Sequence, residues 1–187
     1  DMLATMKAKL DAGRSLLYMT ARYVDIYKAL EDIARERKLT PEERQECKKF
    51  SKLADAFTPL AKGMNSEFAN QNSYDCIQVH GGSGFMMEYK CQQLYRDARI
   101  TSIYEGTTQL QTVAAIRYVT NGTYMSVIRD YEAIPVAEEY EGYMRRIKEM
   151  ASKLEAVTNA VKDANDQELL DFCARKLYEM TAYTIMC

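Results

Sequence analysis

The sequence predicts an all-α protein, an up-and-down bundle of long helices with extra helices toward the C-terminus. Helix breakers are few, with eight Gly and three Pro among 187 residues. Ala, Leu, Met, Glu, Lys and Gln, which favour helix, are abundant. Apolar residues recur at intervals of three, four and seven, whereas strand-type alternation is hard to find. With 47% hydrophobic residues, the chain can bury a proper core.

The first predicted helix covers about residues 2–37. Its apolar side chains recur at spacings that place them on one helical face. They are Leu3, Met6, Leu10, Leu17, Tyr23 or Val24, Tyr27, Leu30 and Ile33. The pattern begins directly after Asp1, and we therefore expect earlier parts of the same domain to precede this residue.

A second long helix is predicted from Thr40 to Val79. Thr40 suits an N-cap, Pro41 fits the first helical position, and Glu43 completes a capping box. The apolar stripe continues through the range, although Pro59 removes one backbone donor and favours a kink. We therefore expect one bent helix and not two separate helices.

Consecutive glycines end the second helix. The run His80-Gly81-Gly82-Ser83-Gly84 offers a left-handed C-cap and a tight backbone turn, so a loop is expected there. The helical pattern resumes over residues 87–98. A short connection is expected over residues 100–104, and a further helix over residues 106–119.

Two breaks divide the remaining sequence. Asn121-Gly122 is a typical helix end, and Ile134-Pro135 interrupts the pattern again. We place a domain boundary at the first break, giving domains of residues 1–121 and 122–187. The two helices expected in the second domain cover residues 136–165 and 169–186. The total is five or six helices, and because the last one ends without a cap, we expect the chain to continue beyond it.

The charge distribution argues against several classes of function. The 25 basic and 27 acidic residues are interspersed along the chain, and the formal net charge is -2. The sequence therefore offers no basic patch for nucleic acid. No apolar run approaches the roughly 18 residues of a membrane span, and the N-terminus lacks the layout of a secretory signal. We expect a cytoplasmic protein.

The cysteine pattern predicts neither a disulfide framework nor a metal site. The cysteines are odd in number and widely spaced, they form no Cys-x-x-Cys pair, and His80 is the only histidine. They are Cys47, Cys76, Cys91, Cys173 and Cys187. We interpret them as reduced thiols that serve as small apolar residues on helices.

Glu105 is the strongest candidate for a chemical role. It precedes Gly106 at an expected helix start, where the helix dipole stabilises any carboxylate, with or without a function. The functional interpretation is a general base. Ile103 and Tyr104 would then desolvate the carboxylate, and Gly106 would let a ligand approach the backbone. The local pattern leaves both interpretations open.

The glycine-rich turn also has two interpretations. The N–H groups of Gly81-Gly82-Ser83-Gly84 can converge on a phosphate, or the turn can serve only as a helix end. It does not match the dinucleotide fingerprint, because no strand precedes it and Met87 occupies the place of the third glycine. His80 stands at a helix C-terminus, where the dipole favours its cationic form, and we interpret it as structural.

Three motifs, taken together in this order and spacing, resemble the C-terminal helical domain of acyl-CoA dehydrogenases. They are Gln78-Val79-His80-Gly81-Gly82-Ser83-Gly84-Phe85, Arg96-Asp97-Ala98-Arg99 and Ile103-Tyr104-Glu105-Gly106-Thr107-Thr108-Gln109-Leu110-Gln111. The resemblance covers about residues 1–121. Residues 122–187 resemble the start of the extra helical C-terminal region found in a subgroup of larger family members.

The resemblance implies roles for residues of the first and the third motif. Glu105 matches the catalytic base, which removes the α-proton of an acyl-CoA thioester while a hydride leaves the β-carbon for the flavin of FAD, giving a 2-enoyl-CoA. Gly106 matches a position that lines the thioester site. The positions that match FAD contacts are Gln78, Val79, His80, Gly81 and Gly82, which serve a neighbouring subunit, and Thr107, Thr108 and Gln109.

The resemblance also implies partners and a metabolic role. These are an acyl-CoA substrate, an electron acceptor such as an electron-transfer flavoprotein, further copies of the chain in a homo-oligomer, and a place in fatty acid metabolism. In the family, the flavin lies between this domain and a β-domain absent from this sequence, so we expect the chain alone to bind FAD poorly and to be inactive. The alternatives are a non-catalytic helical oligomerisation or interaction module, and an acyl-CoA oxidase, which passes electrons from flavin to oxygen.

Overall fold

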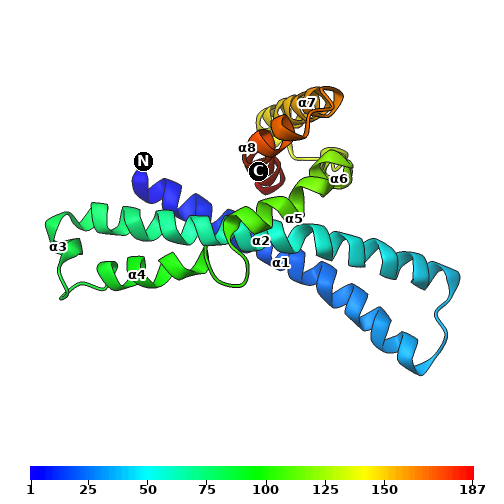
Figure 1. The fold of residues 1–187 in the computed structure, drawn as a ribbon, viewed down its shortest axis with the longest axis horizontal. Coiled ribbons are helices and arrows are strands. Elements are labelled where there is room, and N and C mark those ends of the chain that lie inside the picture. Colours follow the sequence, from blue (N-terminus) through cyan, green and yellow to red (C-terminus); the bar gives the residue numbers. More distant parts are fainter. The chain divides into compact units, whose positions relative to one another are not determined.

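A computed structural model describes residues 1–187 as helices and their connections, with no β-strand, and so confirms the all-α prediction. The chain divides into two compact units, Asp1–Gln111 and Thr112–Cys187 (Figure 1). Each unit is described by itself. The predicted boundary after residue 121 stays a prediction.

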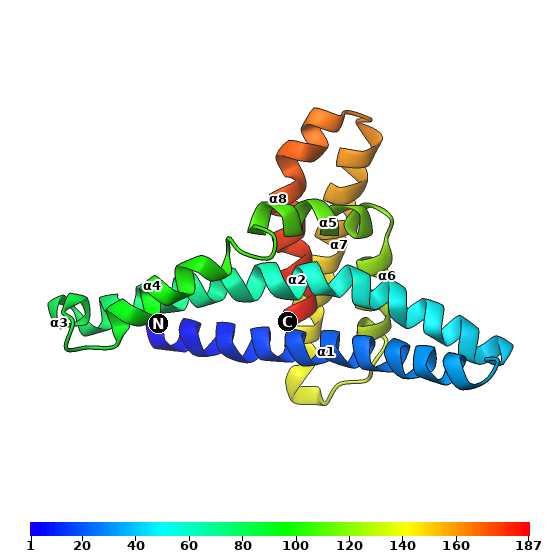
Figure 2. The ribbon, with the colours of Figure 1, turned by 60° about the horizontal axis from the view of Figure 1, so that its bottom comes forward.

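Two long helices form the frame of the first unit. Helix α1 (Met2–Glu36) and helix α2 (Pro41–His80) run antiparallel (Figure 2), and α2 is continuous through Pro59, as the sequence predicted. The predicted capping box is present: the Glu43 N–H donates to the Thr40 hydroxyl, and the Thr40 N–H donates to the Glu43 carboxylate. Arg37 and the Thr40 N–H, both donors to this carboxylate, lower the pKa of Glu43 to about 2.

The core of this unit lies between α1 and α2. The ring of Tyr23 meets the ring of Phe57 edge-on, with 5.2 Å between centroids. Gly13 marks a close approach of the two helices, because a Cβ atom there would lie 2.2 Å from Oδ1 of Asn65. The Asn65 amide donates to the carbonyls of Gly13 and Ala61. These contacts fix α2, along which the candidate functional residues are placed.

The chain reverses direction after α2. Gly81 takes a φ of 61° and ends the helix. A short helix, α3 (Gly82–Phe85), stands where a loop was predicted, and α4 (Cys91–Thr101) returns beside α2 (Figure 2), where the Asn70 amide donates to the Ala98 carbonyl at 3.1 Å. The predicted helix over residues 87–98 was thus displaced, since α4 begins only after a series of turns and continues through the start of the expected connection.

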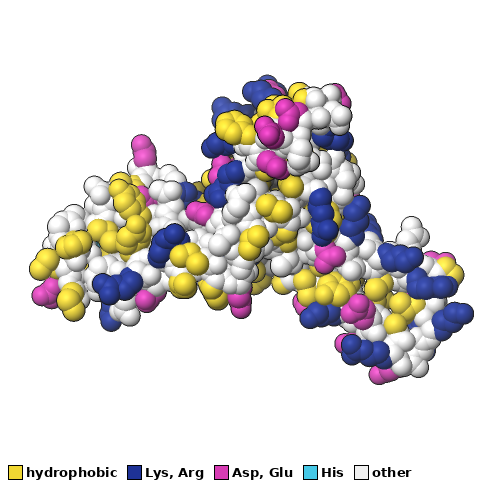
Figure 3. Space-filling view, in the orientation of Figure 1, with side chains coloured by type: hydrophobic (Ala, Val, Ile, Leu, Met, Phe, Trp, Pro, Cys, Tyr) yellow, Lys and Arg dark blue, Asp and Glu magenta, His cyan; other side chains and the backbone are white.

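An apolar surface lies at this end of the first unit (Figure 3). Phe85, Met86 and Met87 are 75%, 52% and 87% exposed. Three adjacent exposed apolar side chains are unfavourable in water, and such surfaces are common where a further protein surface packs.

The second unit contains a helix that the sequence did not predict. Helix α5 (Thr108–Thr120) contains the division between the units. The predicted break at Asn121-Gly122 follows it, and Gly122 has a φ of 79°. The unit continues with α6 (Thr123–Glu132), a 3-10 turn (Glu138–Tyr140), α7 (Glu141–Asp163) and α8 (Gln167–Met186). With α3 and α6 the total is eight α-helices, so the predicted five or six was wrong. Both missed helices are too short to give a long periodic pattern.

The second unit has its own core. Tyr124 of α6, Leu154 of α7 and Tyr178 of α8 are each at most 2% exposed. Arg129 of α6 pairs with Glu155 of α7 at 2.5 Å. None of the helices in either unit combines the length and apolarity needed to cross a lipid bilayer.

Candidate functional site

The backbone is strained at Glu105. Its φ is 51°, a left-handed conformation that side chains other than those of Asn and Asp rarely adopt. Asn165, after α7, is the other non-glycine residue with a positive φ, and asparagine tolerates that conformation. A glutamate held in this way costs on the order of 1–3 kcal/mol, and such strain is typical of functional sites. The residue singled out from the sequence is therefore also a backbone outlier.

Lys62 of α2 stabilises this conformation through hydrogen bonds to backbone carbonyls around it. The Glu105 loop, residues 102–107, connects α4 to α5. The Lys62 ammonium donates to the carbonyl of Thr101 at 2.9 Å and to that of Gly106 at 2.6 Å, and it lies 5.8 Å from the ring centre of Tyr104. The amide of Gln111 donates to the carbonyls of Glu105 and Gly106 at 3.3 Å.

Gly106 has to be a glycine. Its φ is 92°, and a Cβ atom there would lie 2.7 Å from Nε2 of Gln111. Because the Gln111 amide holds the loop carbonyls, a side chain at this position would disturb the same hydrogen bonds that fix Glu105.

The start of α5 fixes the residues after the loop. The Thr107 hydroxyl accepts a hydrogen bond from the Leu110 N–H at 3.3 Å, as an N-cap does. The Thr108 hydroxyl is buried and donates to Oε1 of Glu67 at 2.6 Å. Gln109 is exposed beside them. The five consecutive residues Glu105, Gly106, Thr107, Thr108 and Gln109 thus lie together at the start of α5, and their roles stay predictions.

A groove of about 640 Å³ opens beside the Glu105 loop. Its lining includes Thr107, Thr108 and Gln109 from the start of α5, Glu67 from α2, and Tyr95 and Arg99 from α4. Hydroxyl, amide, guanidinium and aromatic groups therefore meet around one open space, which suits a polar ligand with planar parts.

Two residues of this region, Lys62 and Glu67, were not predicted from the sequence. Lys62 and Glu67 belong to no motif, and neither is near Glu105 in sequence. Lys62 is half-buried between the buried Ala61 and Gly63 of α2. In the sequence, the one indication of a role for Lys62 was that a charged residue interrupts the apolar stripe of this helix.

The Glu105 side chain itself is open to solvent. Ile103 is 44% exposed and Tyr104 is 50% exposed. The desolvation of the carboxylate expected from these two neighbours is therefore absent within this chain, because both side chains project into solvent instead of covering it. For the Glu105 carboxylate to be shielded from water, a covering group from outside this chain is required.

The glycine turn, Gly81–Gly84, is held by local contacts. The Gly81 N–H donates to the Gln78 carbonyl at 3.2 Å, and the Gly84 N–H donates to the Gly81 carbonyl at 3.0 Å. A Cβ atom on Gly84 would lie 2.7 Å from the Ile77 carbonyl, whereas a Cβ atom on Gly82 would meet nothing within 4 Å. The fold of this chain therefore requires glycine at position 84 but gives no reason for glycine at position 82.

The structure does not bring the two groups of site residues together. The sequence-predicted residues Gln78, Val79, His80, Gly81 and Gly82 are all exposed at the end of α2. Glu67, which binds Thr108, lies about 20 Å earlier along the same helix. The groove and the glycine turn are therefore separate places along α2.

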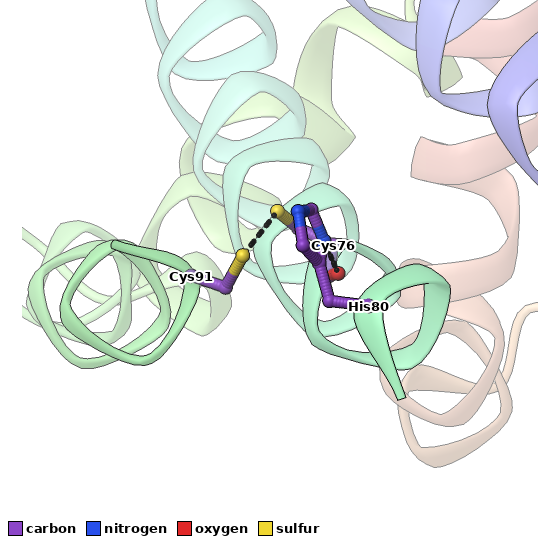
Figure 4. A group of neighbouring side chains, drawn as sticks. All are labelled: Cys76, His80 and Cys91. Carbon is purple, nitrogen blue, oxygen red and sulfur yellow. Dashed lines mark hydrogen bonds between the residues drawn. The ribbon is translucent and has the colours of Figure 1, made fainter. Parts of the chain in front are cut away.

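Cys76, His80 and Cys91 meet at the end of α2 (Figure 4). The two sulfur atoms are 3.3 Å apart, and both thiols are free. The hydrogen bond to Cys91, together with burial, raises the pKa of the Cys76 thiol. The sequence did not predict this cluster, because Cys76 and Cys91 are 15 positions apart. A loop was expected between them, and nothing in the sequence showed that α3 and the following turns bring them together.

Family models match both parts of the chain. One, described as "Acyl-CoA dehydrogenase, C-terminal domain", matches residues 1–119. Another, described as "Acyl-CoA dehydrogenase C terminal", matches residues 120–187.

Individual relatives align with somewhat more than half of the chain. It is 36% identical over 110 residues to a 3-methylmercaptopropionyl-CoA dehydrogenase of Ruegeria pomeroyi, covering 59% of this chain and 17% of that protein. It is 33% identical over 110 residues to a caffeyl-CoA reductase-Etf complex subunit of Acetobacterium woodii, covering 59% and 23%. An acyl-CoA dehydrogenase complexed with FAD from Bacillus anthracis matches with a TM-score of 0.61 and 25% identity, over 99% of this chain and 31% of that one.

Proposed function

The chain belongs to the acyl-CoA dehydrogenase family, and from this premise we propose that it forms the C-terminal helical part of an FAD-dependent enzyme that oxidises an acyl-CoA to a 2-enoyl-CoA. The curated relatives are several times longer than the aligned part of the chain. The rest of such an enzyme would supply the remaining walls of the flavin and substrate sites.

The strained backbone of Glu105 carries this proposal. Lys62 and Gln111 hold the strained loop through three hydrogen bonds to its carbonyls and a fourth to that of Thr101, the last residue of α4, yet Glu105 is exposed. A fold gains nothing from holding an exposed glutamate in a costly conformation. An enzyme gains a carboxylate that is aimed before substrate arrives.

The proposed role of Glu105 is that of a general base. Its carboxylate takes the proton from the carbon next to the thioester carbonyl, and the C–H electrons move toward that carbonyl. The backbone N–H of Glu105 donates to the thioester oxygen, where negative charge develops. FAD, when bound, would supply the acceptor for the hydride of the β-carbon, so that the substrate loses one proton and one hydride in all. A covering domain would desolvate Glu105 and strengthen it as a base.

The residues of this chain fit contacts with FAD. Thr107, Thr108 and Gln109 place hydroxyl and amide groups at the groove. Gly82 has open space where a side chain would be, so a ligand can approach its backbone closely. Because the glycine turn and the groove lie about 20 Å apart along α2, we propose that they serve two different flavins, the turn contacting that of a neighbouring subunit.

The proposed partners follow from the same features. The exposed Phe85, Met86 and Met87 suit a contact between copies of the chain in a homo-oligomer. An electron-transfer flavoprotein is the proposed acceptor, supported by the relative that is named as part of an Etf complex. Both named relatives act on CoA thioesters with different acyl groups, one as a dehydrogenase and one as a reductase.

The test is the replacement Glu105→Gln in the full-length flavoenzyme, with Glu46→Gln, an exposed glutamate on α2, as the matched control. Stopped-flow absorbance follows the bleaching of oxidised flavin after mixing with acyl-CoA. We expect the rate to fall by about 10²–10⁴-fold in Glu105→Gln and to stay unchanged in the control. Normal bleaching in Glu105→Gln would reject the proposed base. A parent protein without flavin would favour an interaction module, and rapid peroxide formation in air would favour an oxidase.

A further inference from the structure

Two helices contribute to a compact group of metal-binding side chains. Cys76 and His80 stand four residues apart on α2, so they share one helical face, and Cys91 is the first residue of α4. One ligand atom from each residue lies within 4.8 Å of the other two. The cluster lies outside the groove, and the proposed reaction gives no role to Cys76 or Cys91, whereas His80 is also among the positions that match FAD contacts.

The orientation of His80 suits a metal ligand. Its Nδ1 lies 2.9 Å from the Cys76 carbonyl oxygen. Because a carbonyl only accepts, Nδ1 carries the proton and Nε2 keeps a free lone pair. Figure 4 shows the other ring nitrogen on the side of the two sulfurs. Metal-binding histidines typically hold their second nitrogen through such a hydrogen bond to a backbone carbonyl.

We propose that Cys76, His80 and Cys91 bind one Zn²⁺ ion, with water in the fourth position. Two sulfurs bound tetrahedrally at about 2.3 Å from zinc lie about 3.8 Å apart. The observed separation is 3.3 Å, so a shift of about half an ångström suffices. A disulfide would instead require the sulfurs to approach to about 2.05 Å.

The balance of the binding step is simple. Each thiol releases one proton and becomes a thiolate, His80 binds as the neutral ring, and the charge of the ion is cancelled by two thiolates. Cys91 is buried and Cys76 half-buried, whereas His80 is exposed, so the ion can enter from the His80 side. Two sulfurs and one imidazole are the ligands that zinc prefers over magnesium or calcium.

A bound ion would fasten α2 to α4. The two cysteines are 15 positions apart, and the segment between them contains the glycine turn and the exposed apolar side chains. Closing this segment would restrict the motion of the turn. Because only the folded chain brings the three ligands together, zinc is expected to stabilise the chain by an amount that rises with the logarithm of the free zinc concentration above the dissociation constant.

The test uses the reduced 187-residue chain, without flavin or substrate, so its result is independent of the proposed function. Zinc affinity is measured by competition with a chromophoric chelator, and the geometry by the visible spectrum after Co²⁺ substitution. We expect one ion per chain, a tetrahedral thiolate spectrum, and a melting temperature that rises with zinc. Cys76→Ser, Cys91→Ser and His80→Gln are each expected to weaken binding by about a hundredfold or more.

Matched controls are available in this chain. Cys47→Ser and Cys173→Ser remove half-buried thiols elsewhere and should leave zinc binding unchanged. His80 is exposed, so His80→Gln should keep its helical circular dichroism even if Cys91→Ser unfolds. The proposal is overturned if the reduced chain binds no stoichiometric zinc, if His80→Gln binds as tightly as the unaltered chain, or if the control variants lose binding equally.

Discussion

The Glu105 loop and the glycine turn are held in opposite ways. In the Glu105 loop, a non-glycine residue adopts a positive φ, and side chains from α2 and α5 hold it in place. In the glycine turn, a glycine adopts the positive φ, and the hydrogen bonds run between near neighbours in sequence. The loop carries strain supported from a distance, whereas the turn is relaxed and locally supported.

The difference teaches which residues each region needs. In the loop, the identity of Glu105 is costly to the fold, and Lys62 is needed to keep the geometry. In the turn, the packing requires glycine at position 84, whereas no contact within this chain requires glycine at position 82. Glu105 and Gly82, whose identity the fold does not require, are among the residues that we assign to ligands.

The largest effect is expected from removing the distant support. Lys62→Met keeps the apolar stem but deletes the ammonium, which leaves the carbonyls of Thr101 and Gly106 without their shared donor. We expect a loss of about 2–3 kcal/mol in the free energy of unfolding. Because the chain has no tryptophan, urea denaturation is followed by circular dichroism.

Lys48→Met provides the control for that change. Lys48 lies on the same helix but is exposed, and its replacement is expected to change stability by less than about 0.5 kcal/mol. If Lys62→Met were as harmless as Lys48→Met, the Glu105 loop would not depend on distant support, and the contrast between the two regions would fail.

A smaller effect separates two glycines of the same turn. Gly84→Ala places a Cβ atom against the Ile77 carbonyl and the His80 side chain, so we expect a loss of about 1–3 kcal/mol. Gly82→Ala has open space, and its stability should change by less than about 0.5 kcal/mol.

The same pair of variants distinguishes packing from ligand binding. In the full-length flavoenzyme, Gly82→Ala is expected to weaken FAD binding, measured by flavin release during dilution, although it leaves stability intact. Equal loss of stability in both variants would mean that the turn is packed more tightly than its open surface indicates.

The sequence predicted the long elements well because their signals are local and repeated. The periodic stripes and the capping box around Thr40 specify α1 and α2 nearly to the residue. Helix α3 was missed because its four residues include two glycines, which have low helix propensity and whose helical state depends on what surrounds them. The site residues came from motif adjacency. Lys62, Glu67 and the Cys76–His80–Cys91 cluster did not, since only folding brings them to their partners.

A gain in stability, smaller than the losses above, is expected at the residue with the largest proposed role. Glu105→Gly relieves the cost of a φ of 51°, on the order of 1–3 kcal/mol, but adds the backbone freedom of glycine to the unfolded chain, about 0.5–1 kcal/mol. The net change should lie between zero and about 2 kcal/mol of added stability, measured by urea denaturation. Asn165→Gly is the control, with a smaller gain, because asparagine already tolerates the conformation. A clear loss of stability in Glu105→Gly would mean that the glutamate side chain supports the fold, and the strain would no longer point to a function.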